Sequence, residues 1–272
     1  MTTPPRLTDR HALDLRRARA RPEALFLHET AADDAQDRLA MVNRTFTDVA
    51  VVTPFPQVWA PRFPEATMVP EAEVLDLTEG ALDLVIHGLC LHWVDDPVGQ
   101  LIQCRRALRP DGVCLALTLG GQTLHELRAA LAQAETEVTC GLSPRVAPMA
   151  EIRDLGALLQ RAGFALPVAE SAPLTVSYAS ALHLMRDLRA MGETNALHAR
   201  LRRPTRRAVL LRAAQIYSEN FALPDGRVSA TFEIITLTGW APDASQPKPL
   251  RPGSAAQRLA DALGTSETPL KD

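Results

Sequence analysis

The sequence predicts an α/β protein organised around a mostly parallel, doubly wound sheet. Strand-length apolar runs alternate with helical patterns along most of the chain. Residues 82–121 read as strand, loop, helix, turn and strand, and a helical crossover of this kind is what joins parallel strands. A β-rich stretch, 230–240, follows near the end. Together these features indicate a doubly wound sheet with covered faces.

Length and composition allow one large domain with an appendage. The chain has 272 residues, of which 46% are apolar, and this excludes wholesale disorder. We expect an N-terminal helical segment at 1–43, a main domain at 44–240 with a helical insertion around 179–221, and a tail at 241–272. A net charge of −3 gives no global reason to expect nucleic acid as a partner.

Cysteine usage and hydropathy indicate a cytoplasmic protein. The 4 cysteines are scattered, so neither a disulfide framework nor a zinc site is predicted. No apolar run approaches the roughly 20 residues that a membrane span needs. The Arg-rich start resembles a transit peptide, but Asp9 and Asp14 interrupt it, and a solvated helix is the preferred interpretation.

The first half of the chain yields helices, two short strands and the start of the central unit. Residues 7–43 are helical in pattern and are divided at Pro22. Strands are predicted at 46–52 and 66–69, with a stiff proline turn at 53–57 between them.

The central unit contains two buried strands and one helix. Residues 82–86 and 113–119 are apolar runs of strand length. Asp96 and Pro97 predict a helix start, and the helix is expected to hold Arg109 in its last turn and to end at Pro110–Gly112.

The C-terminal half continues this alternation. Thr123 followed by Glu126 predicts a capping box, with a helix running to about Val138. Gly163 is expected to close the next helix. The remaining predictions are helices at 151–162, 181–191, 205–221 and 255–263, strands at 174–178 and 230–240, and a turn at Asp225-Gly226.

In a doubly wound sheet, ligands bind outside the carboxyl ends of the strands, near the switch in strand order. Here those ends are residue 53 onward, 87–93 and 119–122.

Several motifs together resemble one family. They are LHWVDD (91–96), GGQTLHELR (120–128), AETE (134–137), SPRVAP (143–148), DLGALLQRAGF (154–164), DLRAMGETNAL (187–197) and DGRVSATFEII (225–235). The chain resembles class I S-adenosylmethionine-dependent methyltransferases, and more narrowly mitochondrial complex I assembly factor 5 with its bacterial relatives, which are cousins of the malonyl-carrier-protein methyltransferase. The mitochondrial member is associated with arginine hydroxylation.

The resemblance implies a Rossmann-like methyltransferase fold with a mostly parallel sheet, an antiparallel C-terminal strand and helical insertions. It implies S-adenosylmethionine as cofactor and a protein or carrier-bound substrate, such as a respiratory complex subunit. No catalytic residue is assigned. The cofactor-binding positions that it implies are Thr53, Phe55, Glu71, Asp76, Leu77, His87, Gly88 and Leu89, and the substrate positions are His92, Trp93, His125, Glu126, Arg128 and Arg145.

The departure from the family lies after the first strand. The family's D-x-G-x-G-x-G turn falls on Val51, Thr53, Phe55 and Gln57, and none of these is glycine. A side chain there would collide with the cofactor that glycine lets the backbone approach. Two functions therefore stay open: a methyltransferase with a reshaped site, and a non-catalytic assembly or scaffold factor that kept the substrate-binding half. A Phe55 that fills the crevice would contradict the enzyme.

Other polar clusters allow alternative interpretations. His87 and His92 with Asp95 and Asp96 suggest a two-His-one-carboxylate iron site, but packing roles are preferred and no metal is predicted. A second cluster consists of His125, Glu126 and Arg128. Either it faces a substrate, or Glu126 caps the helix and the other two side chains are solvated.

Two arginine features also have a plain and a functional interpretation. Arg145 either holds a carboxylate or is an ordinary loop arginine. The run of Arg200, Arg202, Arg203, Arg206, Arg207 and Arg212 could meet an acidic protein or RNA, although a solvated helix face is preferred. Few aromatic residues, 4% overall, weaken the RNA interpretation, and no nucleic acid is predicted.

Overall fold

The computed structural model describes residues 6–247 and 257–266. The described residues up to Pro242 form one compact unit, and those from Asp243 belong to a second, small one. The second unit contains helix α9 (Leu259–Leu263). The first two residues of the predicted 255–263 helix lie outside the described residues.

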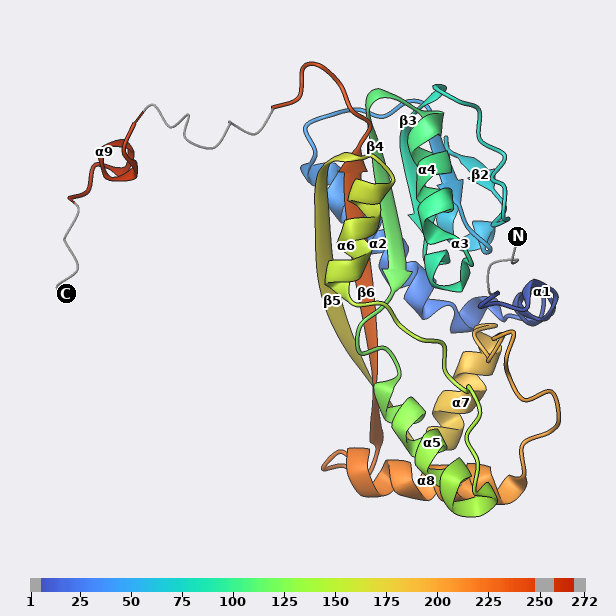
Figure 1. The fold of residues 1–272 in the computed structure, drawn as a ribbon. Helices are drawn as coiled ribbons and strands as arrows, with labels where there is room; N and C mark the ends of the chain where they lie inside the picture. The colour runs from blue at the N-terminus through green and yellow to red at the C-terminus, as the bar shows by residue number, and fades with distance from the viewer. Residues whose placement is uncertain (1–5, 248–256, 267–272) are drawn as a thin grey trace, which may run out of the picture. The chain divides into compact units, whose positions relative to one another are not determined.

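A six-stranded sheet forms the centre of the first unit (Figure 1). Strands β1, β2, β3 and β4 run parallel, β6 pairs antiparallel with β4, and β5 pairs antiparallel with β6. The strand order is β2-β1-β3-β4-β6-β5, so the direction of winding switches between β1 and β3. The predicted fold class, with its antiparallel C-terminal strand, is confirmed. The strands are β1 (Val49–Val52), β2 (Thr67–Val69), β3 (Leu82–Gly88), β4 (Leu108–Leu119), β5 (Ala165–Tyr178) and β6 (Val228–Trp240).

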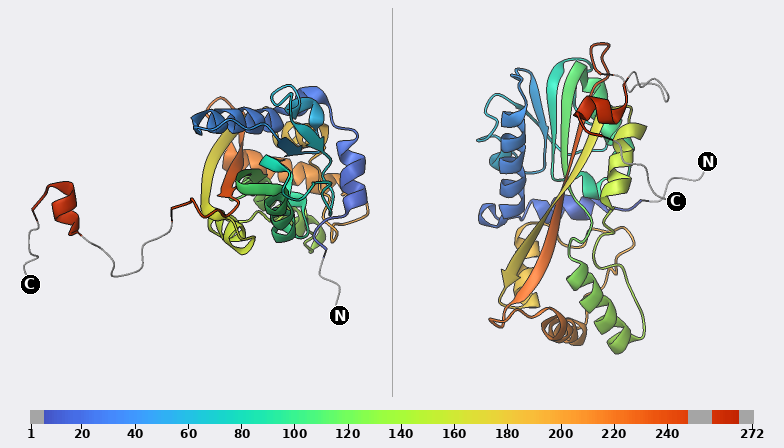
Figure 2. Two further views of the ribbon diagram at one scale, coloured as in Figure 1. Left: turned by 90° about the horizontal axis from the view of Figure 1, so that it is seen from above. Right: turned by 90° about the vertical axis from the view of Figure 1, so that its left-hand side faces the viewer.

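Helices cover both faces of the sheet because successive side chains of a strand point to opposite faces. Val51 of β1 packs in the core cluster that holds α2 (Phe26–Met41) and α3 (Pro56–Trp59). Its neighbours Ala50 and Val52 pack in the cluster that holds α4 (Pro97–Ala107) and α6 (Ile152–Arg161). Figures 1 and 2 show α2 behind the sheet and α4 and α6 in front of it.

A helical lobe lies beyond the carboxyl ends of the parallel strands. It consists of α5 (His125–Thr139), α7 (Ala181–Ala190) and α8 (Arg207–Phe221), which pack beside the far end of the long antiparallel pair β5 and β6 (Figure 2). Near the same edge lie α1 (Arg10–Arg17) and two single-turn helices, η1 (Pro22–Ala24) and η2 (Leu91–Trp93). None of the described helices is long and apolar enough to cross a bilayer.

The helix of the central unit ends earlier than predicted. Helix α4 stops at Ala107, and β4 begins at Leu108, so Arg109 stands in a strand and not in a last helical turn. Pro110 explains the difference, since the residue before a proline is driven into extended conformation. Arg109 instead pairs with Asp48 at 2.7 Å.

The predicted capping box does not form. Leu124 occupies the N-cap position of α5 in a left-handed conformation, with no side-chain cap. The hydroxyl of Thr123 donates to the Gly120 carbonyl at 2.7 Å and accepts from the Glu233 amide. Glu126 is buried and accepts from Thr231 at 2.6 Å. Contacts with β6 therefore override the local signal.

Two further elements differ from the prediction. The proline turn at 53–57 leads into the short helix α3, and β5 extends over fourteen residues where five were predicted. The β5 sequence is hard to recognise because its side chains are mostly exposed and it contains Pro167 and Pro173. Prolines are tolerated there because β5 is an edge strand.

Candidate functional site

The ends of β1 and β3 meet at one edge of the sheet, as the fold class predicts. Val52 is in register with His87, and Thr53 follows directly. After β3 the chain turns at Leu89, which adopts a left-handed conformation with φ 55° and donates its amide to the Leu117 carbonyl at 3.0 Å. This edge forms the switch-point crevice, where a doubly wound fold usually binds its cofactor.

Three side chains, which we call the aromatic plug, occupy that crevice: His28, Phe55 and Trp59. All are buried, with exposed fractions of 4%, 3% and 0%. The His28 ring meets Phe55 edge to face, with centroids 4.8 Å apart. The indole Nε1–H of Trp59 donates to Nδ1 of His28 at 3.4 Å. Burial lowers the pKa of His28 to about 3, so this ring is neutral and can accept that proton.

Trp59 lies directly on the backbone of β3. A Cβ placed on Gly88 would come within 2.7 Å of two indole carbons of Trp59. Glycine is thus needed here to admit the protein's own indole. The void that remains beside His28 and Leu89 has a volume of only about 10 Å³.

The residues at this crevice do not fit S-adenosylmethionine in the position that the family resemblance implies. The resemblance implies a glycine at the position of Phe55, whose ring is packed in the core. The backbone of Gly88 faces an indole, which leaves no room for a ligand. Binding would require both aromatic side chains to leave the core, at a cost of several kcal/mol for buried rings of this size.

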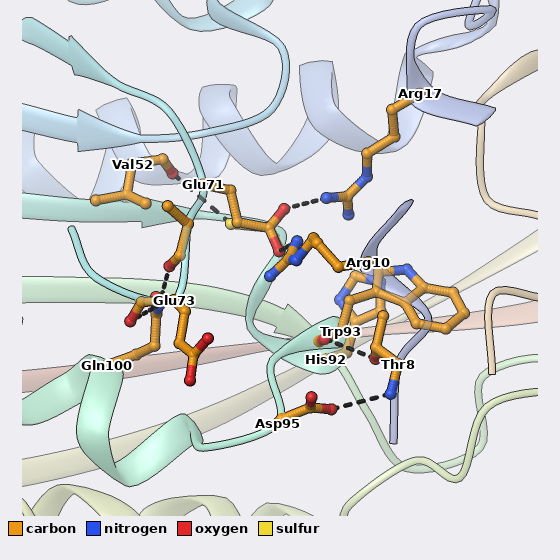
Figure 3. A network of polar contacts seen from close by, with 12 residues as sticks. Thr8, Arg10, Arg17, Val52, Glu71, Glu73, His92, Trp93, Asp95 and Gln100 are labelled. Atoms are coloured by element: carbon orange, nitrogen blue, oxygen red, sulfur yellow. Dashed lines mark hydrogen bonds and ion pairs between the residues drawn. The ribbon is translucent and has the colours of Figure 1, made fainter. Parts of the chain in front are cut away.

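The acidic residue after β2 is also engaged within the chain. Glu71 receives Arg10 at 2.6 Å on one oxygen and Arg17 on the other, as Figure 3 shows. The Glu71 and Arg17 side chains are only 2% and 6% exposed. Both Glu71 oxygens are therefore already held by guanidinium groups, and ribose hydroxyls would have to compete with these charge-assisted contacts.

An open hollow remains outside the ends of β1 and β2. Its volume is about 320 Å³, and Thr53, Pro54, Met68 and Glu71 are among its lining residues. Asp76 and Leu77, two further predicted cofactor positions, do not line it. Asp76 is exposed, and Leu77 packs against the α4 side of the core.

A second buried acid connects this region to η2. Glu193 lies 3.3 Å from Arg17 and 3.4 Å from His92, and it accepts from the indole of Trp93 at 2.5 Å. Burial would favour the neutral acid, but the Arg17 charge and these contacts outweigh it and hold the pKa of Glu193 well below its usual range. His92 and Trp93 are thereby fixed at the strand edge.

His87 has a structural role within the fold. It is fully buried, its Nε2 lies 3.0 Å from Gln100, and Cys90 lies 3.5 Å from its Nδ1. Burial lowers the pKa of His87. Gln100 in turn donates to the Ala72 carbonyl, which holds the segment after β2 against α4 (Figure 3).

The alternative iron site does not assemble from its proposed ligands. Asp95 accepts from the amides of Leu7 and Thr8, and Asp96 caps α4 through Gly99. Within residues 6–247 and 257–266, no group of three or more His, Cys, Asp or Glu side chains is placed to hold a metal ion.

An apolar cavity of about 260 Å³ lies between the sheet edge and the helical lobe. Of the predicted substrate positions, His92, Trp93 and Arg145 line it. Its apolar lining includes Leu27, Leu119, Leu124, Leu127, Leu131, Val146, Met149, Met185, Leu188, Leu210 and Phe232.

The other three predicted substrate positions lie outside this cavity. His125 packs edge to face on Phe221, and its Nδ1 lies 2.9 Å from the Gln122 carbonyl. Arg128 donates to the Ala147 carbonyl at 3.1 Å. The second carboxylate oxygen of Glu126 is buried without a hydrogen bond, although His125 lies 3.3 Å away.

The cavity opens on a larger basin with a volume of about 1160 Å³, which we call the arginine basin. Five residues line both the cavity and the basin: Arg145, Arg189, Thr194, Asn195 and Thr205. Of the described residues, none that lines the basin is acidic. Its arginines are Arg16, Arg19, Arg21, Arg145, Arg186, Arg189, Arg200, Arg202 and Arg203.

Part of the predicted arginine run lies in this basin. Arg200, Arg202 and Arg203 stand in the loop before α8, so the expectation of a solvated helix face was wrong for them. Arg145 binds a carboxylate in bidentate geometry, and this carboxylate belongs to Glu135 of the same chain. The Nη2–Oε1 distance is 2.6 Å and the Nε–Oε2 distance is 3.2 Å.

Sequence reasoning missed the residues that close the crevice. The predicted site residues did not include Trp59, His28, Arg17 or Glu193, because the partners of these residues lie far away along the chain. One signal was present: a tryptophan follows soon after the strand end, where the family's glycine-rich turn should lead into a helix.

Comparison with known proteins agrees with this architecture. Residues 23–116 match the family model described as a methyltransferase domain. The chain is 40% identical over 198 residues to the mitochondrial arginine-hydroxylase NDUFAF5 of Danio rerio, covering 73% of this chain and 61% of that protein. It is 34% identical over 183 residues to the malonyl-[acyl-carrier protein] O-methyltransferase of Laribacter hongkongensis, covering 67% of this chain and 59% of that protein.

A solved structure, the YcgJ protein of Bacillus subtilis, aligns with a TM-score of 0.49 and 12% identity, covering 79% of this chain and 99% of that one. The two curated relatives, by contrast, are matched over less than two thirds of their own length.

Proposed function

Because this chain is related to the arginine-hydroxylase NDUFAF5 proteins and has a methyltransferase fold, we propose that it is a partner-binding protein that has lost cofactor-dependent catalysis. Its partner is a protein or a carrier-bound group, and its role is that of an assembly or scaffold factor. The resemblance to a complex I assembly factor makes a respiratory complex subunit the first partner to test.

The aromatic plug is the observation that carries this proposal. Phe55 and Trp59 fill the crevice that would receive the methionine end of S-adenosylmethionine, and both are nearly inaccessible to solvent. Methyl transfer depends on holding acceptor and sulfonium in line within a dry pocket. A crevice that cannot admit the sulfonium cannot supply that alignment.

The substrate side of the fold remains open, which supports a binding role. The apolar cavity and the arginine basin together offer far more space than the residual 10 Å³ void at the switch point. Apolar pockets with a few polar groups at the mouth are typical ligand sites. Retention of this half, without the cofactor half, is what a binding factor requires.

A second candidate is a methyltransferase with a reshaped site. The open hollow beside Thr53 and Glu71 favours it, because both residues are cofactor positions implied by the resemblance. In that case the cofactor would lie outside the plug, and Glu71 would have to exchange an arginine for the ribose.

Isothermal titration calorimetry of the full chain separates the two candidates. S-adenosylmethionine, S-adenosylhomocysteine and adenosine are titrated in parallel into wild-type protein and into a Glu71→Gln variant. We expect no saturable heat from either cofactor form, because the plug occupies the methionine position.

Micromolar binding of S-adenosylhomocysteine that is weakened by Glu71→Gln would overturn the proposal in favour of the reshaped site. Adenosine that binds without the methionine-bearing forms would mean that only the hollow is functional. That result would leave the catalytic loss in place.

A further inference from the structure

We propose that the arginine basin and the apolar cavity together form a docking site for an acidic segment of a partner protein, which seats one apolar side chain in the cavity. This inference rests on the proposed function, because it names the chemistry of the partner that the open half of the fold binds.

Charge is the first argument. In the part of the chain that the structure describes, nine arginines and no acid line the basin, although the net charge of the chain is −3. Arg200 and Arg202 pair with Asp9, and Arg145 pairs with Glu135. Among the described residues, no ion pair within 4.0 Å accounts for the other six, which include Arg19, Arg186 and Arg189.

The fold brings these arginines together from four separate segments: the region of α1, the loop before α6, α7 and the loop before α8. At Arg16, burial and the charge of the neighbouring Arg200 lower the pKa of the guanidinium. Like charges held close together destabilise the free protein, and an acidic ligand relieves that repulsion.

Continuity with the cavity is the second argument. Arg145 and Arg189 line both spaces, so a ligand anchored on the basin lies at the mouth of the cavity. The cavity, at about 260 Å³, suits a single large apolar side chain more than an extended chain. An apolar anchor surrounded by charge pairs is a common design of protein interfaces.

The composition of the basin favours a protein over other anions. Its lining, taken over residues 6–247 and 257–266, contains no aromatic residue on which a nucleobase could stack. One carboxylate or phosphate could engage only one or two of the nine guanidinium groups, whereas a peptide with several carboxylates can engage many in two-pronged fashion.

Selection from a random peptide library tests this inference and does not require the partner to be identified first. The full-length wild-type chain serves as bait, next to a basin variant carrying Arg186→Glu, Arg189→Glu and Arg203→Glu. All three positions are exposed, so the substitutions leave the core intact. A control variant carries Arg106→Glu, Arg153→Glu and Arg161→Glu, which impose the same charge change on exposed positions outside the basin.

We expect wild-type and control proteins to enrich peptides with several Asp or Glu residues around one large apolar residue. The basin variant should lose this enrichment, and a selected peptide should bind it at least about tenfold more weakly by fluorescence anisotropy. In a Met149→Trp variant, which narrows the cavity, the preference for the apolar residue should disappear while the acidic preference stays.

Enrichment without acidic residues, equal binding to the basin and control variants, or tighter binding of a single-stranded oligonucleotide than of any peptide would each overturn the inference. These outcomes are independent of the cofactor titration. Acidic peptides could bind to a chain that also binds S-adenosylhomocysteine, and then the proposed function alone would fail.

Discussion

At the residue scale, Trp59 is the side chain on which the closed crevice depends. It is fully buried, it covers Gly88 and its Nε1–H is bound by His28. Two other aromatic rings lie beside it, Phe63 stacked at 6.2 Å and His28. The space where the resemblance implies a cofactor is occupied by core packing, which contributes to stability in proportion to the buried area.

Trp59→Ala should therefore destabilise the fold strongly. We expect a loss of about 3–5 kcal/mol in the free energy of unfolding, since a large buried ring is removed and a cavity is left. Urea denaturation measures it. Met41→Ala, at a side chain that is 78% exposed, is the control and should change the free energy by less than about 0.5 kcal/mol. A small effect at Trp59 would mean that the crevice is not closed by this ring.

Loss of the Glu71 charge should destabilise the fold about as much as loss of the Trp59 side-chain volume. Glu71→Ala leaves the buried Arg17 guanidinium with only the weaker Glu193 contact at 3.3 Å. Breaking a buried pair in this way costs about 3–5 kcal/mol. Asp48→Ala provides the matched control, because the Asp48–Arg109 pair is about half exposed and such pairs contribute at most about 1 kcal/mol. Equal losses in the two variants would show that Glu71 is not buried.

At the element scale, the contact between α2 and α3 couples the closed crevice to pH. His28 of α2 has its pKa lowered to about 3 by burial, whereas an unfolded histidine titrates near 6.5. At a pH above the pKa of the unfolded state, His28 is neutral in both the folded and the unfolded chain. It then adds no pH dependence to the free energy of unfolding. Below that pKa, the unfolded chain takes up a proton that the folded chain refuses, so stability falls as the pH falls.

Replacing His28 should remove this dependence. His28→Gln keeps an acceptor for the Trp59 indole but cannot titrate in this range. We expect its free energy of unfolding to decline less steeply between about pH 6 and pH 4, by up to about 1.4 kcal/mol per pH unit. Denaturation at about pH 8, where neither state is protonated, serves as the internal reference. Identical slopes in variant and wild type would contradict a buried neutral His28.

Elements were predictable where a local pattern decided the structure. The apolar runs of β1, β3 and β4 and the alternation of β6 follow directly from their side chains, and Gly163 ends α6 with φ 82°. The α4–β4 boundary and the start of α5 differed because a proline in one case and contacts with β6 in the other outweighed the helical signal.

The site was predictable only in outline. Strand ends place Thr53, His87 and Leu89 at one edge, because the carboxyl ends of parallel strands must meet there. The partners that close the edge were not predictable, since Arg17 and His28 reach it from helices that precede the sheet in sequence. Proximity in space between such segments leaves no periodic trace in the sequence.

At the scale of the whole molecule, the two sides of one sheet edge differ in how they are filled. On the β1–β2 side, aromatic and ionic contacts from α1, α2 and α3 occupy the strand ends where the resemblance implies a cofactor. On the β4 side, the helical lobe encloses a cavity that opens on the arginine basin. This division is the basis of the proposal that the chain binds a partner without transferring a methyl group.

The most direct test is a crystal structure of the full chain grown with a large excess of S-adenosylhomocysteine. We predict continuous density for the rings of Phe55 and Trp59 against Gly88, an intact Arg17–Glu71 pair, and no nucleoside between β1 and β3. Density for S-adenosylhomocysteine at the ends of β1 and β3, with Trp59 displaced from Gly88, would contradict the account.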